Sequence, residues 1–407
     1  MPFRTHLRAY TAVLPLIAYR GMAGGLPVLL GLFIAQRWGL AELAAYTVAY
    51  SAVAVGMIVA DWGGMRALPR NLAMLAPEAA AEMLAGANAF RVLVVALMLV
   101  GGVAAAMFGL IDAHVAQYLA LLFPLCPLLV MATNGVSARV VTGETRALGV
   151  AVAAGLALFA VLGAIVLAQD LGPRWFVAAY VAGKCVETIV VVAKRWWVLS
   201  VSTRSMRETV LALWPFSSQM ILGVLYTRMA VFTVERLTTR PELGVFAVAS
   251  ALQNALLLIP VSLGLLHFPE LTRRAQERDS AGMRAIVVRY TITSAAGVMF
   301  GLLCLVLLSR PLGASLDVPP SSHGFVLAFA ALALLSIFSA IFGFLMQARG
   351  QEATAARLSV LTLSMAIAYQ VAALSAWGLW GIVAAVTAAE LTTIAVFGLA
   401  LRRARPA

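Results

Sequence analysis

Long stretches of apolar residues recur from one end of the chain to the other, separated by short polar segments. A helix needs about 20 residues to cross the hydrocarbon core of a bilayer, and most of these stretches reach or approach that length. Twelve of them are found, at residues 11–35, 43–60, 90–111, 114–134, 147–169, 174–193, 209–233, 243–266, 285–308, 323–347, 355–376 and 379–401. The pattern predicts an all-α polytopic membrane protein with about twelve transmembrane helices.

The first stretch does not have the pattern of a cleavable signal peptide. It contains Arg20 and is longer than the apolar region of a signal peptide, which has about 7–15 residues. No convincing small-residue cleavage site follows it before the next stretch. We therefore expect it to be the first helix of the mature protein.

The composition agrees with a membrane protein and excludes a soluble enzyme. Hydrophobic side chains make up 63% of the 407 residues and charged ones 11%, whereas soluble domains have about 25% charged residues. Twelve helices take up roughly 250 residues, which leaves no room for a soluble catalytic domain. Motifs of nucleotide-binding loops, zinc proteases and serine hydrolases are absent from the sequence. We expect no enzymatic activity and no catalytic residues.

Cysteine and histidine usage gives no sign of a metal site. Cys126, Cys185 and Cys304 lie inside apolar stretches, are odd in number and form no CxxC pair. The four histidines lie far apart in the sequence. The sequence therefore predicts neither a bound metal nor a cofactor.

The basic residues are distributed unevenly over the connections between the stretches. The net charge is +12, from 29 lysines and arginines against 17 acidic residues. If the N-terminus is cytoplasmic, twenty-one basic residues lie on the inner side and five on the outer side. Cytoplasmic loops of membrane proteins carry such an excess, so the charge indicates topology and not nucleic-acid binding. Both termini are predicted to be cytoplasmic.

The two halves of the chain match each other at an offset of 200 residues. Pro15 matches Pro215, and Glu42 matches Glu242, at equivalent points of equivalent stretches. Because each half has an even number of spans, the repeats must be parallel and related by an axis along the membrane normal. The sequence thus predicts two six-helix bundles around a central cavity.

The predicted bundles comprise residues 1–197 and 198–407. The connection between them, residues 194–209, begins with Lys194, Arg195 and two tryptophans. Basic and indole groups suit the headgroup region, so this connection is predicted to be an interfacial linker.

Ionisable residues at membrane depth are the best candidates for function, because burying a charge there costs about 2.5–3.5 kcal/mol. Arg20 and Arg228 either face a polar cavity and bind an anion, or extend to an interface. Lys184 and Glu187 share one helical face, where they bind substrate and exchange protons, or merely neutralise each other. Glu390 is either a proton-coupling group or a hydrogen-bonding partner of a neighbouring helix.

Uncharged polar residues within the spans are the second set of candidates. Gln253 and Asn254 lie in the eighth stretch. They are candidates for substrate binding, although amides in helix bundles often serve to hold helices together.

Two segments carry a resemblance to a known family. The stretch LAELAAY at Leu40–Tyr46 opens the second span, and DWGGMRALPR at Asp61–Arg70 closes it. PELGVF at Pro241–Phe246 is the counterpart of the first segment in the second half. These segments resemble the polysaccharide flippase branch of the multidrug/oligosaccharidyl-lipid/polysaccharide exporter superfamily. Ala44 departs from the pattern, since a glycine is expected there.

The resemblance implies a V-shaped pair of six-helix bundles in the inner membrane. It implies transport of an undecaprenyl-diphosphate-linked oligosaccharide to the periplasmic leaflet, with membrane lipids and glycan polymerases as partners. A cavity for such an anionic glycan should hold cations, which agrees with Arg20, Lys184 and Arg228. Three alternatives remain open: a cation-coupled multidrug exporter of the same superfamily, a multi-span enzyme acting on the lipid-linked glycan, and a non-transporting membrane scaffold.

Overall fold

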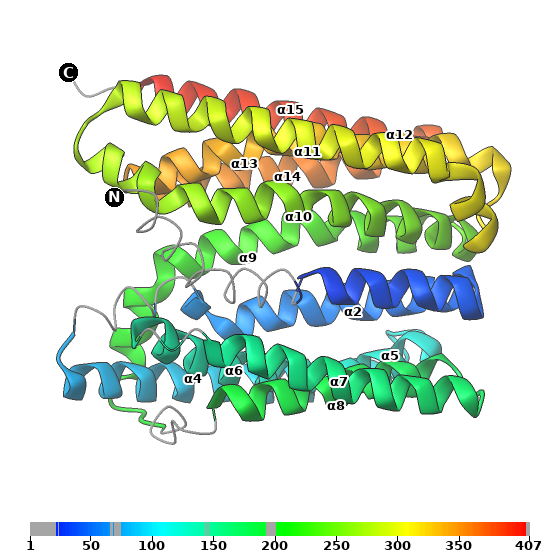
Figure 1. Ribbon diagram of the computed structural model, residues 1–407, viewed down its shortest axis with the longest axis horizontal. Helices are drawn as coiled ribbons and strands as arrows, with labels where there is room; N and C mark the ends of the chain where they lie inside the picture. Colours follow the sequence, from blue (N-terminus) through cyan, green and yellow to red (C-terminus); the bar gives the residue numbers. More distant parts are fainter. Residues whose placement is uncertain are drawn as a thin grey trace, which may run out of the picture. The chain divides into compact units, whose positions relative to one another are not determined.

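The computed structural model describes residues 22, 24–65, 68, 75–142, 144, 146–192 and 201–403. Apart from turns and short connections, these residues are helical, and none of them forms a strand (Figure 1). Residues 24–38 are helical, and the helices after them are α2 (Leu40–Asp61), α4 (Pro77–Met107), α5 (Ala113–Leu122), α6 (Leu125–Val141), α7 (Arg146–Ala168), α8 (Pro173–Val192), α9 (Met206–Leu237), α10 (Arg240–Gln276), α11 (Ser280–Ser315), α12 (His323–Ala331), α13 (Ala333–Ala348), α14 (Glu352–Trp377) and α15 (Leu379–Arg403). The predicted all-α fold is confirmed.

The helices reproduce the predicted spans closely. Ten spans in the described part of the chain are long and apolar enough to cross a membrane, and the bent helix α9 makes eleven. They correspond one to one to the last eleven predicted stretches. The part of the first stretch before residue 22 lies outside the described residues, as do Arg20 and the residues Lys194–Trp197 of the linker.

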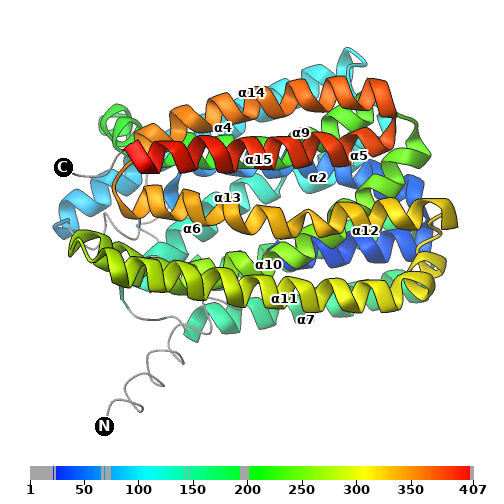
Figure 2. The same cartoon turned by 90° about the horizontal axis from the view of Figure 1, so that it is seen from above.

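The order and breaks of the helices repeat along the chain. α10 begins at Arg240, 200 residues after α2 begins at Leu40. The span Ala113–Arg139 consists of two helices, α5 and α6, which meet at Phe123 and Pro124, and a proline within a span interrupts its helical hydrogen bonding. Its counterpart in the second half, Pro320–Ala348, is also broken, between α12 and α13 (Figure 2). The duplicated plan therefore extends to interruptions within spans.

The described chain divides into two compact units. Unit 1 contains Val48–Val224, that is, most of α2, all of α4 to α8 and the first part of α9. Its helices α7 and α8 pack along their lengths with two glycines facing each other. A Cβ atom on Gly155 would lie 2.7 Å from the carbonyl oxygen of Gly183, and the reverse distance is 2.6 Å. Small residues allow this close approach of two membrane helices.

Unit 2 contains Gly24–Thr47 and the chain from Leu225 onward. The axes of α10 to α15 are roughly aligned (Figure 1). The helices enclose an apolar core that includes Leu256, Val298 and Ile337. Residues 24–38 join this unit through Gly24 and Gly25, which face the side chain of Leu258 on α10. Residues 24–47 thus belong to the second unit, and the start of α9 to the first. The predicted bundle boundary at residue 197 lies outside the described residues and stays a prediction.

One prediction about a charged residue is wrong. The sequence predicts a helix that starts at residue 90 and counts Arg91 among the twenty-one basic residues on the inner side. In the structure α4 begins at Pro77, and the Arg91 side chain, about four turns into the helix, is fully buried. Arg91 therefore cannot contribute to the charge of a loop.

A glycine at the start of α10 allows this helix to approach the first residue of α2 closely. Gly244 lies against Leu40, the first residue of α2, and a Cβ atom on Gly244 would be 2.7 Å from the Leu40 Cβ and 2.9 Å from its carbonyl oxygen. This contact gives a physical reason for the glycine in the segment Pro241–Phe246. In α2 the matching position is occupied by Ala44, which is buried.

We expect Gly244→Ala to lower the thermal stability of the purified protein, because the added methyl group overlaps backbone atoms. Overpacking of this kind costs about 1–3 kcal/mol. Gly343→Ala on α13 is the matched control, since its Cβ would meet no atom within 4 Å and alanine favours a helix. Unfolding in detergent, followed by intrinsic fluorescence, measures both. Equal melting temperatures for the two variants would contradict the contact with Leu40.

Candidate functional site

A buried carboxyl group lies between three helices of unit 2. Glu390 on α15 is 5% exposed, and its Oε1 atom accepts a hydrogen bond of 3.0 Å from the hydroxyl of Ser336 on α13. The hydroxyls of Tyr226 on α9 and Ser339 on α13 lie close to the same carboxyl group. Thr393, one turn along α15, faces the Tyr226 hydroxyl. Carboxylate and hydroxyl oxygens from three helices therefore converge on one point.

Part of this cluster has no hydrogen-bond partner. Glu390 Oε2 and the Tyr226 hydroxyl are buried and complete no hydrogen bond with any described residue. Among the aspartate, glutamate, lysine and arginine side chains in the described part of unit 2, only Glu390 is buried to this degree. An isolated carboxylate in apolar surroundings is costly, so such a group holds a proton or binds a cation. The hydrogen bond from Ser336 agrees with the predicted contact to a neighbouring helix, and the unpartnered Oε2 keeps Glu390 a candidate for ion coupling, which stays a prediction.

Hydrogen bonds between helices hold the elements around Glu390. The Thr233 hydroxyl on α9 donates to Gln370 Oε1 on α14 at 3.2 Å, and both side chains are buried. The hydroxyls of Tyr369 on α14 and Thr392 on α15 lie 3.4 Å apart. These contacts connect α9, α14 and α15 and fix where Tyr226 and Glu390 stand.

The predicted pair in unit 1 forms an ion pair. Lys184 Nζ lies 2.7 Å from Glu187 Oε2, and the two side chains are 14% and 8% exposed. Glu187 also packs against Gly155 of α7. A Cβ atom built on Gly155 would lie 3.0 Å from the Cβ atom of Glu187. The two charges cancel at membrane depth, which agrees with the self-neutralising alternative. Whether the pair also binds substrate or protons stays a prediction.

A second buried network in unit 1 was not predicted. Arg91 donates to the carbonyl oxygen of Asp61 from Nη2 at 2.8 Å and from Nε at 3.1 Å. Its Nη2 lies 3.3 Å from Asp61 Oδ1, and its Nη1 donates to Asn134 Oδ1, whose amide donates to Asn88. The backbone N–H of Met65 donates to Asp61 Oδ2 at 2.8 Å. The acidic-glycine segment that ends α2 thus anchors a satisfied network between α2, α4 and α6.

Two features of the sequence could have indicated this network. Asn88 and Arg91 are three residues apart, so they share one face of a helix that continues upstream of the apolar stretch. Gly64, three residues after Asp61, lies where any side chain would overlap the Arg91 guanidinium. The glycine at position 64 is therefore required for the Arg91 guanidinium to pack beside Asp61.

Arg139 has a structural role at the end of a helix. Its Nε and Nη2 atoms donate to the carbonyl oxygens of Val191 and Val190 at 2.8 and 3.0 Å. These carbonyls belong to the last turn of α8, where helical hydrogen bonding leaves acceptors unsatisfied. The guanidinium of Arg139 caps this helix.

The other predicted site residues do not gather in one place. Arg228 is half-buried on α9, but it is two residues from Tyr226 and thus lies on a different face from the Glu390 cluster. Gln253 and Asn254 are half-buried on α10, where the Asn254 amide lies 3.4 Å from the Ser250 hydroxyl. Arg20 lies outside the described residues. Their predicted role in substrate binding stays a prediction.

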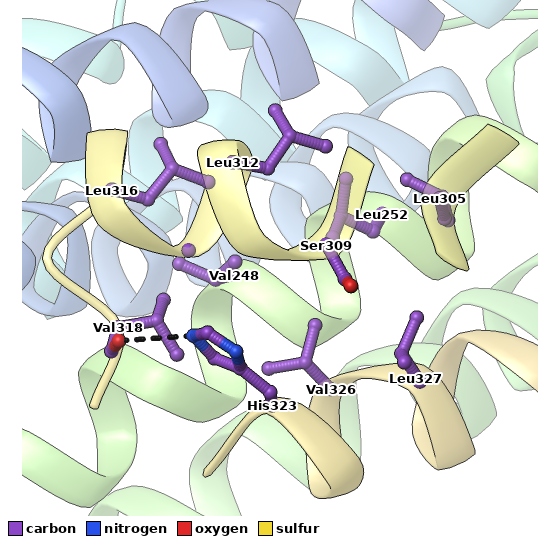
Figure 3. A pocket seen from close by; sticks show the side chains of 11 residues that line it. Val248, Leu252, Leu305, Ser309, Leu312, Leu316, Val318, His323, Val326 and Leu327 are labelled. Carbon is purple, nitrogen blue, oxygen red and sulfur yellow. Dashed lines mark hydrogen bonds between the residues drawn. The ribbon is translucent and has the colours of Figure 1, made fainter. Parts of the chain in front are cut away.

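A small pocket in unit 2 is too small for a substrate. It lies between α10, α11 and α12, has a volume of about 30 Å³ and is lined by apolar side chains together with Ser309 and His323 (Figure 3). His323 Nε2 is 3.3 Å from the carbonyl oxygen of Val318. A cavity of this size holds about one water molecule.

The chain matches no protein-family model and no curated protein. It does match solved structures of transporters. An inward-facing multidrug resistance MATE family transporter of the MOP superfamily aligns with a TM-score of 0.69 at 15% identity, over 95% of this chain and 96% of that chain. The lipid II flippase MurJ, in an inward closed conformation, aligns with a TM-score of 0.71 at 12% identity, over 93% of this chain and 86% of that chain.

A third similar structure is a MOP superfamily transporter from Pyrococcus furiosus, described as having a binding pocket of reverse polarity. It aligns with a TM-score of 0.60 at 14% identity, over 96% of this chain and 95% of that chain. The identities are low, so these likenesses concern the fold. The chain has a helical fold similar to that of these MOP superfamily transporters.

We expect Glu187→Gln to destabilise the protein by roughly 3 kcal/mol, because it leaves the Lys184 charge buried without its partner. The double variant Lys184→Met with Glu187→Leu removes both charges and should be more stable than the single variant. Thermal unfolding of both variants in detergent tests this. A double variant that unfolds as early as Glu187→Gln would contradict a self-neutralising pair.

Proposed function

We propose that this protein is an ion-coupled flippase that moves an undecaprenyl-diphosphate-linked oligosaccharide across the inner membrane for polysaccharide biosynthesis. The observation that carries the transport part is the fold, which matches MOP superfamily transporters over nearly the whole chain. The structures it resembles include a multidrug resistance transporter and a lipid II flippase.

The substrate class rests on the sequence resemblance at Asp61–Arg70 and Pro241–Phe246 and on arginine at membrane depth. Guanidinium groups bind phosphate oxygens through two parallel hydrogen bonds, which suits the diphosphate of the substrate. Arg228 is half-buried within a span. Arg20 is the second candidate, with Gln253 and Asn254 as candidates for polar contacts to the glycan. Membrane lipids and a glycan polymerase are the proposed partners, and the cytoplasm is the proposed location of both termini.

Ion coupling is assigned to Glu390. Its carboxyl group has no basic partner among the described residues, is surrounded by hydroxyls and has one oxygen with an unfilled hydrogen-bonding capacity. Binding and release of a proton or cation at this position would change the charge inside unit 2 between the steps of a transport cycle. Glu187 is the weaker candidate, since Lys184 already neutralises it.

A second candidate function is a cation-coupled multidrug exporter. The buried carboxyl of Glu390 favours it, because a cationic drug and a coupling ion can compete for such a group. Two cell assays separate the candidates. Restoration of surface polysaccharide in a bacterium lacking its own flippase supports the first function, and efflux of cationic dyes from an exporter-deficient strain supports the second.

We expect Arg228→Ala and Arg20→Ala each to reduce export of the lipid-linked glycan by roughly tenfold or more, because a hydrogen bond to a charged group is worth about 1.5–3 kcal/mol. Lysine at either position should restore export partly, since it keeps the charge and loses the planar donor pair. Membrane levels of each variant are measured in parallel. Wild-type export by both alanine variants would refute an arginine-lined site.

We expect Glu390→Gln to abolish the dependence of transport on a pH or cation gradient while the protein still inserts at normal levels. The amide keeps the shape of the side chain and can still accept the hydrogen bond from Ser336, but it cannot titrate. Glu352→Gln, at the start of α14, is the control. Transport in vesicles with imposed gradients measures the effect, and gradient dependence that persists in Glu390→Gln would exclude this residue.

A further inference from the structure

One end of unit 2 carries a group of exposed arginines. At this end α10 leads into α11, α13 leads into α14, and α15 ends. Six of its exposed arginines, which we call the arginine rim, are Arg273, Arg278, Arg284, Arg357, Arg402 and Arg403. By the distribution of basic residues along the chain, this end faces the cytoplasm.

The side chains of the arginine rim make no hydrogen bond or ion pair with any residue that the structure describes. Most acidic groups nearby have other partners. Asp279 accepts from Arg274 Nη1 at 2.8 Å, and Glu270 Oε2 lies 3.1 Å from Arg289. The Gly282 backbone N–H, together with Arg274, holds the pKa of Asp279 below its ordinary value. This carboxylate therefore stays charged at neutral pH and stays paired with Arg274. The six guanidinium groups are thus available to a ligand.

Three helices of the rim combine an exposed arginine with an exposed apolar stripe. On α11, Val288 follows Arg284 by four residues and is 48% exposed, and Ile292 follows one turn later at 63%. Residues four apart share one face of a helix. Lipid acyl chains cover the exposed apolar faces of membrane helices. Arg284 therefore lies at the headgroup end of an acyl chain that packs along Val288 and Ile292.

The same order of residues recurs on the neighbouring helices. On α14, Val360 and Leu361 follow Arg357 by three and four residues and are 52% and 48% exposed. On α15, which runs in the opposite direction, Leu399 is 54% exposed and precedes Arg402 and Arg403 by three and four residues. α14 and α15 pack along their lengths, and α14 begins at the end of the unit where α15 ends, so their arginines lie at the same end.

The opposite end of unit 2 differs in charge. Its exposed arginines, Arg37, Arg236, Arg240 and Arg310, are matched in number by the acidic residues Glu42, Glu235, Glu242 and Asp317. An excess of positive charge therefore belongs to one end of this unit and not to its whole surface.

We infer that the arginine rim binds the phosphate headgroups of anionic phospholipids of the inner leaflet, whose acyl chains lie along the stripes of α11, α14 and α15. Guanidinium groups pair with phosphate oxygens, and a negatively charged leaflet attracts basic groups at its surface. The stripes favour a lipid over a free phosphate ion, because they supply the apolar contact that only a lipid can use. This surface is independent of the substrate and coupling residues named above.

The test compares lipids retained by the purified full-length protein. Native mass spectrometry after exchange into mixed micelles counts bound phosphatidylglycerol and phosphatidylcholine. We expect wild type to retain several-fold more phosphatidylglycerol, and the excess to decline as salt is raised, since exposed charges are screened. The triple variant Arg357→Gln, Arg402→Gln and Arg403→Gln should lose most of this excess. Arg236→Gln with Arg310→Gln, at the opposite end, should retain it.

Thermal unfolding provides the second arm. Phosphatidylglycerol should raise the melting temperature of wild type and of the control variant, and a molar excess of glycerol phosphate should not. A rise with glycerol phosphate alone would assign the rim to free anions, and equal retention of both lipids by wild type would overturn the proposal. Equal loss by the control variant would do so as well. If the triple variant fails to insert, the salt and lipid comparison on wild type still decides.

Discussion

The hydrocarbon core of a membrane contains no water, and this constraint governs every polar side chain in the spans. A polar group there must find its partner within the protein or lose several kcal/mol. Two buried arginines of unit 1 meet the constraint through protein partners: Arg91 is bound by Asp61 and Asn134, and Arg139 binds the last carbonyls of α8. The helices of this unit are joined where their polar groups meet.

Glu390 in unit 2 meets the same constraint differently. Only one of its oxygens accepts a hydrogen bond from a described residue, and the nearby Tyr226 hydroxyl also makes no hydrogen bond with a described residue. A network whose members are all satisfied has a single preferred state and resists change. A network with an unpaired hydrogen-bonding atom can accept a proton or an ion. Such a network suits a transport cycle, whereas a fully hydrogen-bonded network suits a structural role.

Local patterns of the sequence predict the helices well, because span length and hydropathy depend on neighbouring residues alone. The Lys184–Glu187 pair was also predictable, since its partners are one helical turn apart. The prediction for Arg91 was wrong because a hydropathy search starts the helix beside the last charged residue before the apolar stretch. In the structure α4 begins about four turns before Arg91. The surroundings of Glu390 could not be predicted, because Ser336 is 54 residues away and is brought close only by the packing of α13 on α15.

The membership of the two compact units has a consequence for how the chain folds. Residues 24–47 come early in the sequence and belong to unit 2, while the first part of α9 comes after the midpoint and belongs to unit 1. Each half of the polypeptide thus supplies a piece of the other half's unit, as in an exchange of segments between subunits. Neither unit can be completed while its half of the chain is alone. During synthesis the first unit is therefore completed only after the first part of α9 has been made.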